Sequence, residues 1–473
     1  MVEVRLPAFT DSHVHLAQTG LLLAGLDLAP ARSRDEVLEA VARHARASSD
    51  PVVLGFGWDE TRWPDPSLPT AAELDRATDG QVVLLSRVDG HSALVSGAVL
   101  DRAPQLAETA GWSPDGRVQR AAGRMAREVA EATITRSQRK AAIARALDAA
   151  AAAGLGCVHE MSAPHINAEV DLELIRELAG ERDQIAVVPY WGEHVDADGV
   201  RHAVELGCAG AAGDLNIDGA FGSRTAGLSE PYVDLDPDDP AAHGFRYLDA
   251  EAVARHVVAC TRAGIQAGFH CIGDAGTSAA AEGFRLASQQ VGKESLRAAR
   301  HRLEHLELIE PELIADLASN GVVVSAQPAF DSYWGGEDGM YARRLGVHRA
   351  LATNPFAALV QASVPLAFGS DSPVTPFDPW GAVRAATLHH QPDSRLSTSV
   401  AFAAHTDGGR YASGPDPASG QPTNAWVDWW FDTEPAADRL PRLAAGDRTP
   451  RCLRTVVDGR TVYDRTVEEG HEH

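Results

Sequence analysis

The sequence predicts an α/β fold, a (β/α)8 barrel with a long insertion after its first strand. From residue 150 onward, short apolar runs alternate with segments of helical periodicity, as repeated β-then-α units require. Eight apolar runs can be counted once the run at the start of the chain is included. Several of them end in histidine, aspartate or glutamate, and the active site of this fold lies at the carboxyl ends of the strands.

The predicted strands follow one another along the chain. The first contains Asp11-Ser12-His13-Val14-His15, in which the two histidines alternate and therefore project from one face. The other seven are expected at 155–160, 184–191, 214–218, 266–271, 301–306, 321–327 and 365–370. Helical periodicity fills the gaps, as at 249–263, where Asp249 is placed to start a helix and Gly264 to end it.

One region interrupts this alternation inside the barrel. We expect the barrel to occupy residues 8–412 and to include an insertion at 17–150. The insertion has apolar runs of its own at 51–57 and 81–88, and a long helix rich in Arg, Ala and Glu near 118–153. It is therefore expected to have its own core.

The two ends of the chain are expected to meet outside the barrel. Residues 1–7 and 413–465 should form a reduced β-sandwich, and residues 466–473 a short tail. Asp458-Gly459 stands between two alternating apolar runs, which predicts a β-hairpin there.

Composition excludes several classes of function. The chain has 42 Lys and Arg against 66 Asp and Glu, a net charge of −24, and nucleic-acid phosphates would be repelled by such a surface. No run approaches about 20 consecutive apolar residues, the length that a membrane span needs. The start of the chain lacks the basic flank and apolar core of a signal peptide. Five cysteines without CxxC spacing fit a reduced chain, so we expect a cytoplasmic location.

The polar residues at the strand ends predict a metal site. His13 and His15 can hold one divalent ion together with His270 and Asp371, each of which stands at the end of another predicted strand. Three imidazoles and one carboxylate suit Zn²⁺ by ligand type, and Fe²⁺ and Mn²⁺ are compatible. His305, at the end of a further strand, is either another ligand or a donor to a substrate carbonyl.

Seven short segments stand in order between residue 11 and about residue 390. They are Asp11-Ser-His-Val-His15, Gly57-Trp-Asp-Glu60, Asp89-Gly-His-Ser92, Asp218-Gly-Ala-Phe-Gly-Ser-Arg-Thr-Ala226, His270-Cys-Ile-Gly-Asp274, Glu304-His305 and Gly369-Ser-Asp-Ser-Pro373. In this set the chain resembles the amidohydrolase superfamily of metal-dependent hydrolases, and within it the branch of the N-substituted formamide deformylases. The resemblance implies the barrel, a catalytic divalent ion and hydrolysis of a small molecule.

The chain departs from this resemblance in two places. Members usually have a longer segment before the His-x-His strand, so here half of the sandwich is nearly absent and Glu3–Pro7 is expected to complete it. Many members bridge two ions with a carbamylated lysine on the fourth strand, where this chain has Asp214, and its two lysines both lie in helical stretches. We therefore expect a single ion, with a carboxylate bridge from Glu160 or Asp218 as the alternative.

The remaining site residues are assigned by the chemistry of hydrolysis. Asp371 is the predicted general base, which takes a proton from the attacking water and later passes it to the leaving nitrogen. The carbonyl oxygen needs a hydrogen-bond donor, which His305 or His91 can supply. The candidate substrate contacts are His91, Arg224, Trp58 and Asp218. Trp58 fits a structural role equally well, and Arg224 fits a pair with a nearby acid.

The leading functional hypothesis is hydrolysis of a C–N bond in an amide, formamide or N-acyl compound. Deamination of an amino-heterocycle is an alternative that needs an extra acid, for which Glu160 or Glu60 is available. A lactone or ester substrate, and a non-catalytic barrel that binds a ligand, are further alternatives. Retention of all five predicted metal-site residues favours an enzyme with a small-molecule substrate. Because barrels of this size often dimerise, a homodimer is the expected alternative to a monomer.

Overall fold

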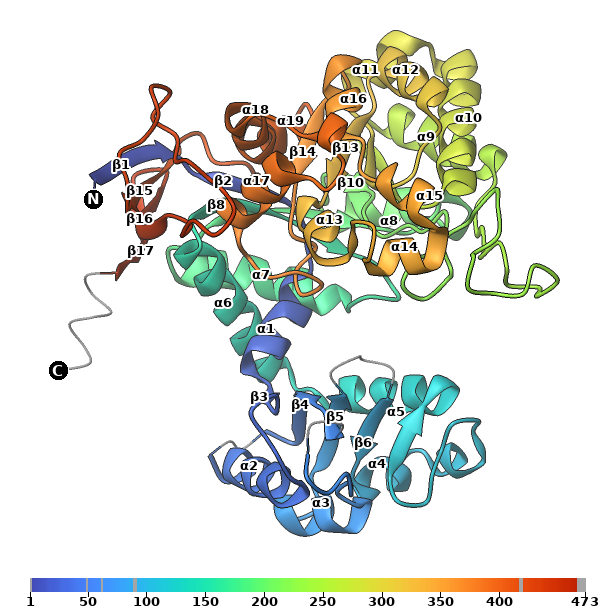
Figure 1. Cartoon of the computed structure of the whole chain (residues 1–473), viewed down its shortest axis with the longest axis vertical. Coiled ribbons are helices and arrows are strands. Elements are labelled where there is room, and N and C mark those ends of the chain that lie inside the picture. Colours follow the sequence, from blue (N-terminus) through green and yellow to red (C-terminus); the bar gives the residue numbers. More distant parts are fainter. Residues whose placement is uncertain (1, 48–49, 61–62, 88–91, 417–419, 466–473) are drawn as a thin grey trace. The chain divides into compact units, whose positions relative to one another are not determined.

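The computed structural model describes residues 2–47, 50–60, 63–87, 92–416 and 420–465. The chain forms two compact units (Figure 1). One contains Met1–Leu16 together with Leu147–His473, and the other contains Ala17–Ala146. The second unit corresponds to the insertion expected at 17–150, apart from the last few residues of that range.

The first unit is built on a parallel sheet of eight strands in the order β2-β8-β9-β10-β11-β12-β13-β14. A parallel bridge between Val14 and Ser372 joins the chain after β14 to the end of β2, so that the sheet closes on itself. The predicted (β/α)8 barrel is thereby confirmed. The strands are β2 (Phe9–Val14), β8 (Leu155–Ser162), β9 (Ala186–Trp191), β10 (Gly210–Ala211), β11 (Gln266–Cys271), β12 (Arg302–His305), β13 (Val323–Ala326) and β14 (Leu366–Phe368).

The fourth strand is displaced from its predicted place. The parallel ladder of β10 consists of Gly210 and Ala211, whereas the predicted run 214–218 lies beyond it and is joined to β11 by a bridge between Asn216 and His270. Asp214 therefore stands past the carboxyl end of β10. In a (β/α)8 barrel that is the end at which catalytic residues gather.

Helices connect the barrel strands. α9 begins where Asp249 accepts a hydrogen bond from the Ala252 amide and ends at Gly264, as predicted. The helices of this unit are α7 (Glu169–Glu181), α8 (Gly199–Glu205), α9 (Ala250–Ala263), α10 (Asp274–Val291), α11 (Lys293–Ala299), α12 (Pro311–Asn320), α13 (Pro328–Trp334), α14 (Met340–Leu345), α15 (Val347–Leu351), α16 (Phe356–Gln361), α17 (Pro379–Leu388), α18 (Thr398–Ala403) and α19 (Gly409–Ala412). None of the helices within the described ranges has the length and apolar character that crossing a membrane requires.

The chain ends meet in one antiparallel sheet, where the reduced sandwich was expected. Its order is β1 (Val2–Pro7), β15 (Ala425–Phe431), β16 (Arg451–Val457) and β17 (Arg460–Asp464), and Figure 1 shows β1 beside β15. Asp458 and Gly459 turn the chain between β16 and β17 with positive φ angles of 47° and 79°, so the predicted hairpin is present. Buried Trp429 of β15 packs edge-on against Phe9 and Trp380 of the barrel unit, with ring centroids 5.8 and 5.5 Å apart.

The inserted unit has a mixed five-stranded sheet between two apolar clusters. β3 (Leu26–Asp27), β4 (Val52–Trp58) and β5 (Val82–Arg87) are parallel, and β6 (Ser92–Val95) and β7 (Arg117–Gln119) follow antiparallel. One cluster includes buried residues of α2 (Arg34–Ala47) and α3 (Ala71–Thr78). The other includes residues of α4 (Gly97–Arg102) and α5 (Arg120–Thr133). The insertion thus has its own core.

The long helix expected near 118–153 is two helices, α5 and α6 (Arg136–Ala152). The break falls in Thr133-Ile134-Thr135, where Ile134 adopts an extended conformation. Three consecutive β-branched residues disfavour helix, which accounts for the break. α1 (Leu16–Ala24) begins the insertion.

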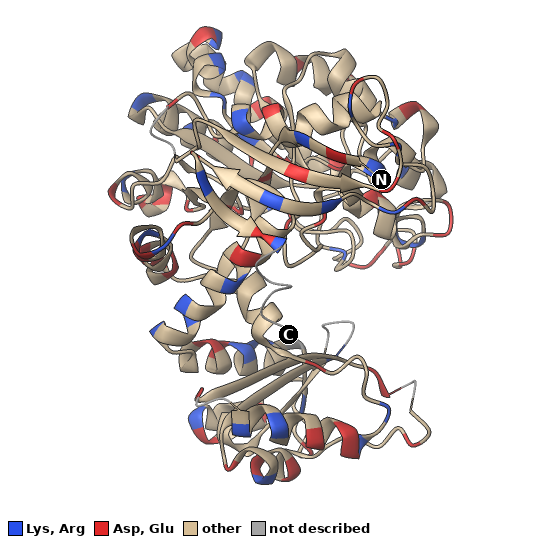
Figure 2. Ribbon diagram, turned by 90° about the vertical axis from the view of Figure 1, so that its left-hand side faces the viewer, with Lys and Arg blue, Asp and Glu red and all other residues tan. Residues whose placement is uncertain are grey.

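Figure 2 shows Asp and Glu interspersed with Lys and Arg along the ribbon of each unit. The expectation that nucleic acid is not a partner rests on the net charge of −24 and stays a prediction.

Candidate metal centre

Six side chains from four strand ends and one loop converge inside the barrel. The predicted His13, His15, His270, His305 and Asp371 are brought together, and Asp214 joins them. The Asp214 carboxylate lies 3.5 Å from His13 Nε2, 3.2 Å from His15 Nε2 and 3.6 Å from His270 Nδ1. Its distance to His305 Nε2 is 3.9 Å. Asp371 Oδ1 lies 3.6 Å from His13 Nε2 and 3.1 Å from His15 Nε2.

These separations are those of atoms that share a metal ion. Two ligands bound tetrahedrally to zinc at about 2.0–2.1 Å are about 3.3–3.4 Å apart. Three of the buried atoms, His13 Nε2, His305 Nε2 and Asp214 Oδ1, have no hydrogen-bond partner among the described residues. Leaving such atoms unsatisfied costs free energy, and a cation among them satisfies all three. The residues present therefore fit a divalent ion.

Each of the four histidines has its second ring nitrogen tied to a hydrogen-bond acceptor. His13 Nδ1 lies 3.0 Å from Glu304 Oε2, and His15 Nδ1 lies 3.0 Å from the Met161 carbonyl. His270 Nε2 lies 3.1 Å from the Gly219 carbonyl, and His305 Nδ1 lies 2.7 Å from Gln327 Oε1. When the outer nitrogen donates its proton, the inner nitrogen, which faces the cluster, is the one that would bind a metal ion. This is the tautomer that a metal ligand needs.

The electrostatics of the cluster favour a cation. Burial lowers the pKa of His13, but the carboxylates of Asp214, Glu304 and Asp371 outweigh it and raise that pKa to about 10. Burial raises the pKa of Asp214, and His13, His15 and His270 reverse this effect and hold its pKa well below the ordinary value. Asp214 is thus ionised at neutral pH.

A buried ion pair holds His13 in place. Arg302 and Glu304 of β12 are both fully buried, and the guanidinium donates to the carboxylate over 2.6 and 2.9 Å. Arg302 also donates to the Ser12 carbonyl at 2.6 Å. Both oxygens of Glu304 are thereby engaged, and one of them also faces His13 Nδ1.

Two of the ligand-bearing strand ends turn through left-handed backbone conformations. His305 has φ +70°, Leu306 φ +47° and Asp371 φ +56°. Non-glycine residues adopt this region rarely and at a cost, and such residues cluster at functional sites. The turns direct His305 and Asp371 into the cluster.

The carboxylates of Glu160 and Asp218, the two expected alternatives for a bridge, are committed to other contacts. Glu160 accepts hydrogen bonds from the Leu16 amide at 2.7 Å, from Asn167 at 2.9 Å and from Ser162 at 3.0 Å. Asp218 accepts from the amides of Ile272, Gly273 and Gly227 at 2.7–2.9 Å. Both acids fasten loops at the carboxyl end of the barrel.

The other candidate substrate contacts have these surroundings. Arg224 donates to Asp234 through Nε and Nη2, at 3.1 and 2.7 Å. Trp58 is buried in the core of the inserted unit and donates to the Leu85 carbonyl at 2.8 Å. His91 lies outside the described residues. As substrate contacts, all three stay predictions.

Sequence reasoning missed two residues at this site. The sequence analysis treats Asp214 as the replacement for a lysine and not as a ligand. The strand predicted at 214–218 begins at Asp214, whereas ligands are expected at the carboxyl ends of strands. His165 lies in the loop after β8, where burial lowers its pKa, Asp214 raises it, and His270 and His15 lower it further. A lone histidine in a loop offered no signal in the sequence.

Two aromatic side chains of α13 lie beside the metal-binding cluster. The ring of Phe330 stacks on His305 with a centroid distance of 6.0 Å and an interplanar angle of 11°. Trp334 lies beside Phe330 at 4.9 Å, and both residues belong to α13. The surface next to His305 is therefore apolar.

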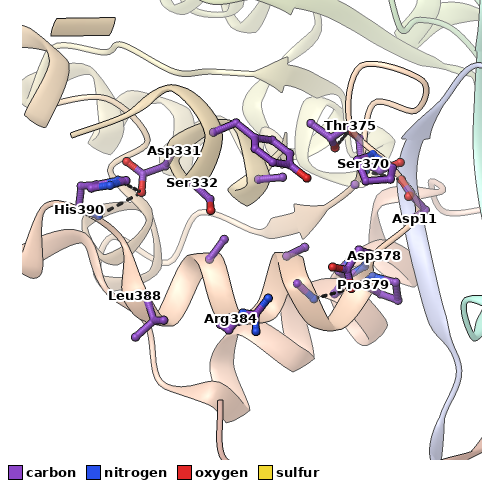
Figure 3. A pocket seen from close by; sticks show the side chains of 18 residues that line it. Asp11, Asp331, Ser332, Ser370, Thr375, Asp378, Pro379, Arg384, Leu388 and His390 are labelled. Carbon is purple, nitrogen blue, oxygen red and sulfur yellow. Dashed lines mark hydrogen bonds and ion pairs between the residues drawn. The ribbon is translucent and has the colours of Figure 1, made fainter. Parts of the chain in front are cut away.

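A separate cavity of about 350 Å³ is lined by Ser370, the residue before Asp371, and by Arg384 and Leu388 of α17 (Figure 3). Figure 3 shows Asp331 and His390, which contact each other, at the end of the cavity away from Asp11 and Ser370. Asp11 and Ser370 connect it to the cluster, because Asp11 Oδ1 accepts from the amides of His13 and Ser370. The described residues that line this cavity do not include the six converging side chains.

Comparison with known proteins gives consistent matches. The family model described as "Amidohydrolase family" matches residues 4–423. YtcJ of Bacillus subtilis (strain 168), whose name provisionally calls it an amidohydrolase, is 28% identical over 412 residues, which cover 81% of this chain and 73% of that protein. The crystal structure of an uncharacterized metal-dependent hydrolase from Pyrococcus furiosus superposes with a TM-score of 0.73 at 25% identity, covering 90% of this chain and 87% of that one. A second such hydrolase, from Pyrococcus horikoshii OT3, has the same fold, with a TM-score of 0.72, 24% identity and coverage of 91% and 86%.

Proposed function

The chain belongs to the amidohydrolase family and is a metal-dependent hydrolase, and on this premise we propose that it hydrolyses a C–N bond of an amide, formamide or N-acyl small molecule. The observation that carries the proposal is the set of four histidines whose outer ring nitrogens are hydrogen-bonded and whose inner nitrogens face Asp214. By ligand type the ion is Zn²⁺. A divalent ion at this place supplies a Lewis acid and lowers the pKa of a water molecule to about 7.

Asp371 acts as the general base in this proposal. Its Oδ1 faces His15 at 3.1 Å, and its backbone is held by the hydrogen bond of its own amide to the His13 carbonyl at 2.8 Å. A carboxylate so placed accepts the proton of the attacking water and returns it to the leaving nitrogen. In this proposal His165, whose pKa responds to Asp214 and His270, contacts the carbonyl oxygen, and His91 stays a predicted donor. Phe330, stacked on His305, favours an apolar group next to the bond that breaks.

The hydrogen bonds of Glu160 and Glu60, the two acids that deamination would need, favour amide hydrolysis over deamination. Glu160 is held by the Leu16 amide, Ser162 and Asn167. Glu60 accepts a hydrogen bond from Arg87 of its own unit at 2.9 Å. These hydrogen bonds engage both carboxylates and support amide hydrolysis over deamination.

The test is a product assay with zinc-reconstituted protein on N-formyl compounds, N-acyl amides and amino-heterocycles. We expect release of formate or another carboxylate from the amides, and no ammonia from the heterocycles. Asp371→Asn should keep its metal and lose most turnover. Asp378→Asn is the matched control, since Asp378 caps α17 and asparagine caps a helix equally well. Ammonia release from heterocycles alone, or full activity of Asp371→Asn, would overturn the assignment.

A further inference from the structure

The cavity shown in Figure 3 is large enough for a small molecule. Its volume is about 350 Å³, and ligand pockets usually measure about 300–1,000 Å³. The charged side chains of its lining are three aspartates and one arginine, namely Asp11, Asp331, Asp378 and Arg384. A cavity whose lining has an excess of carboxylates attracts cations.

Asp11 is a buried carboxylate at one end of this cavity. Its side chain is 1% exposed, and its Oδ1 accepts hydrogen bonds from the amides of His13 and Ser370. Among the described residues, no arginine or lysine forms an ion pair with Asp11. Burying a charge is costly unless an opposite charge accompanies it. A cationic ligand in the cavity would supply that charge.

His405 adds a second hydrogen-bond acceptor to the lining. Its ring is 1% exposed, and Nδ1 lies 3.0 Å from the Thr10 carbonyl, so Nδ1 carries the proton and Nε2 the lone pair. Burial lowers the pKa of the imidazole to about 4, which keeps the ring neutral. No hydrogen bond within the described part of the chain uses Nε2 of His405. An ammonium group has three N–H donors and suits a lining that offers acceptors.

Apolar side chains line the more exposed part of the cavity. Leu388 and Tyr333 are 39% and 59% exposed, and Figure 3 shows Leu388 at the end away from Asp11. At the same end Asp331 and His390 contact each other over 3.0 Å, so these polar groups are already engaged. The cavity therefore combines a buried polar end with an exposed apolar surface.

We propose that this cavity is a second binding site, which takes a primary ammonium group on a short apolar chain, with the ammonium group at Asp11 and His405 and the chain towards Leu388. The guanidinium of Arg384 is held elsewhere, since its Nη1 donates to the Asp447 carbonyl at 2.8 Å. Hydrolysis of an N-substituted amide releases an amine, so a product of the reaction belongs to the same class. That connection rests on the proposed function, whereas binding itself does not.

The test is calorimetry of n-hexylammonium with the zinc-reconstituted chain, and hexanoate is the probe of equal length and opposite charge. We expect hexylammonium to bind and hexanoate not to bind. Ala385→Leu fills part of the cavity and should weaken the binding of hexylammonium by about tenfold or more. Ala403→Leu makes the same substitution at an exposed position of α18 and is the matched control. Circular dichroism checks the fold of each variant.

A second variant leaves the packing of the interior untouched. Leu388→Ser removes exposed apolar surface at the mouth of the cavity, and should weaken hexylammonium binding about threefold to tenfold while methylammonium binds as before. Hexanoate that binds as tightly as hexylammonium would overturn the proposal. So would the absence of amine binding, or an affinity for hexylammonium that is unchanged in both Ala385→Leu and Leu388→Ser. Since no substrate is present in these measurements, the binding site and the proposed function can fail separately.

Discussion

Replacing Glu304 by glutamine is expected to destabilise the barrel by about 3–5 kcal/mol, the cost of leaving one member of a buried ion pair without its partner. Glu304 and Arg302 are both fully buried and joined by two hydrogen bonds. Arg302 also donates to the Ser12 carbonyl, so its guanidinium is anchored in the interior. The variant therefore has a charge that neither water nor a carboxylate stabilises.

The pKa of Glu304 gives a second measure of the same effect. Burial raises this pKa, but Arg302 and His13 outweigh burial and lower it from 4.5 to about 2. At about 1.4 kcal/mol per pKa unit, the difference corresponds to about 3 kcal/mol in favour of the folded state. Because the folded pKa is the lower one, this stabilisation is complete above about pH 5 and is lost as the pH falls towards 2. The gap between wild type and variant should close over that range.

Hydrogen exchange followed by mass spectrometry measures the effect in the barrel itself, with a chelator present so that metal binding does not contribute. Peptides from β11 to β13 should exchange much faster in Glu304→Gln at neutral pH. Glu282→Gln breaks the exposed pair with Arg285 on α10 and should leave exchange unchanged. Barrel amides of Glu304→Gln that exchange at the wild-type rate would refute the reasoning.

Three further outcomes are expected. The apparent affinity for Zn²⁺ should rise as the pH rises above neutrality, because the ion displaces a proton from His13, whose pKa is about 10. Calorimetry in buffers of different ionisation enthalpy should detect the released proton. Trp429→Ala should cost about 3–5 kcal/mol in chemical denaturation, because the indole packs on Phe9 in the interior. Arg224→Gln should leave kcat/KM unchanged, because Asp234 already engages the guanidinium, and a large drop would make Arg224 a substrate contact.

The ligands on regular strands could be predicted from the sequence. His13 and His15 share a face because side chains alternate along a strand, and that alternation depends on local dihedral angles. His270 and His305 follow from the rule that barrel strands carry their active-site residues at the carboxyl ends. The sequence also predicts the fold, the hairpin at Asp458 and the caps of α9. Each of these features depends on patterns among neighbouring residues.

The contacts that orient these ligands could not be predicted. The acceptors for His15 and His270 are the main-chain carbonyls of Met161 and Gly219, and every residue has such a carbonyl. Gln327, which holds His305, lies 22 residues away in the sequence. Partners of this kind are set by tertiary packing. A sequence pattern can therefore name a ligand without naming what fixes its tautomer.

Asp214 shows how a local error hides a residue that carries chemistry. Its strand, β10, has two residues in the ladder, too few for an alternating pattern to reveal where it ends. Placing the strand a few residues late put Asp214 at the start of a run, far from the carboxyl end of the barrel. The replaced lysine then suggested a lost bridge, whereas the aspartate in its place converges with the histidines. Where strand ends supply the other ligands, the residue that replaces a missing ligand is itself a candidate oxygen donor, and its place relative to the strand end decides whether it reaches the cluster.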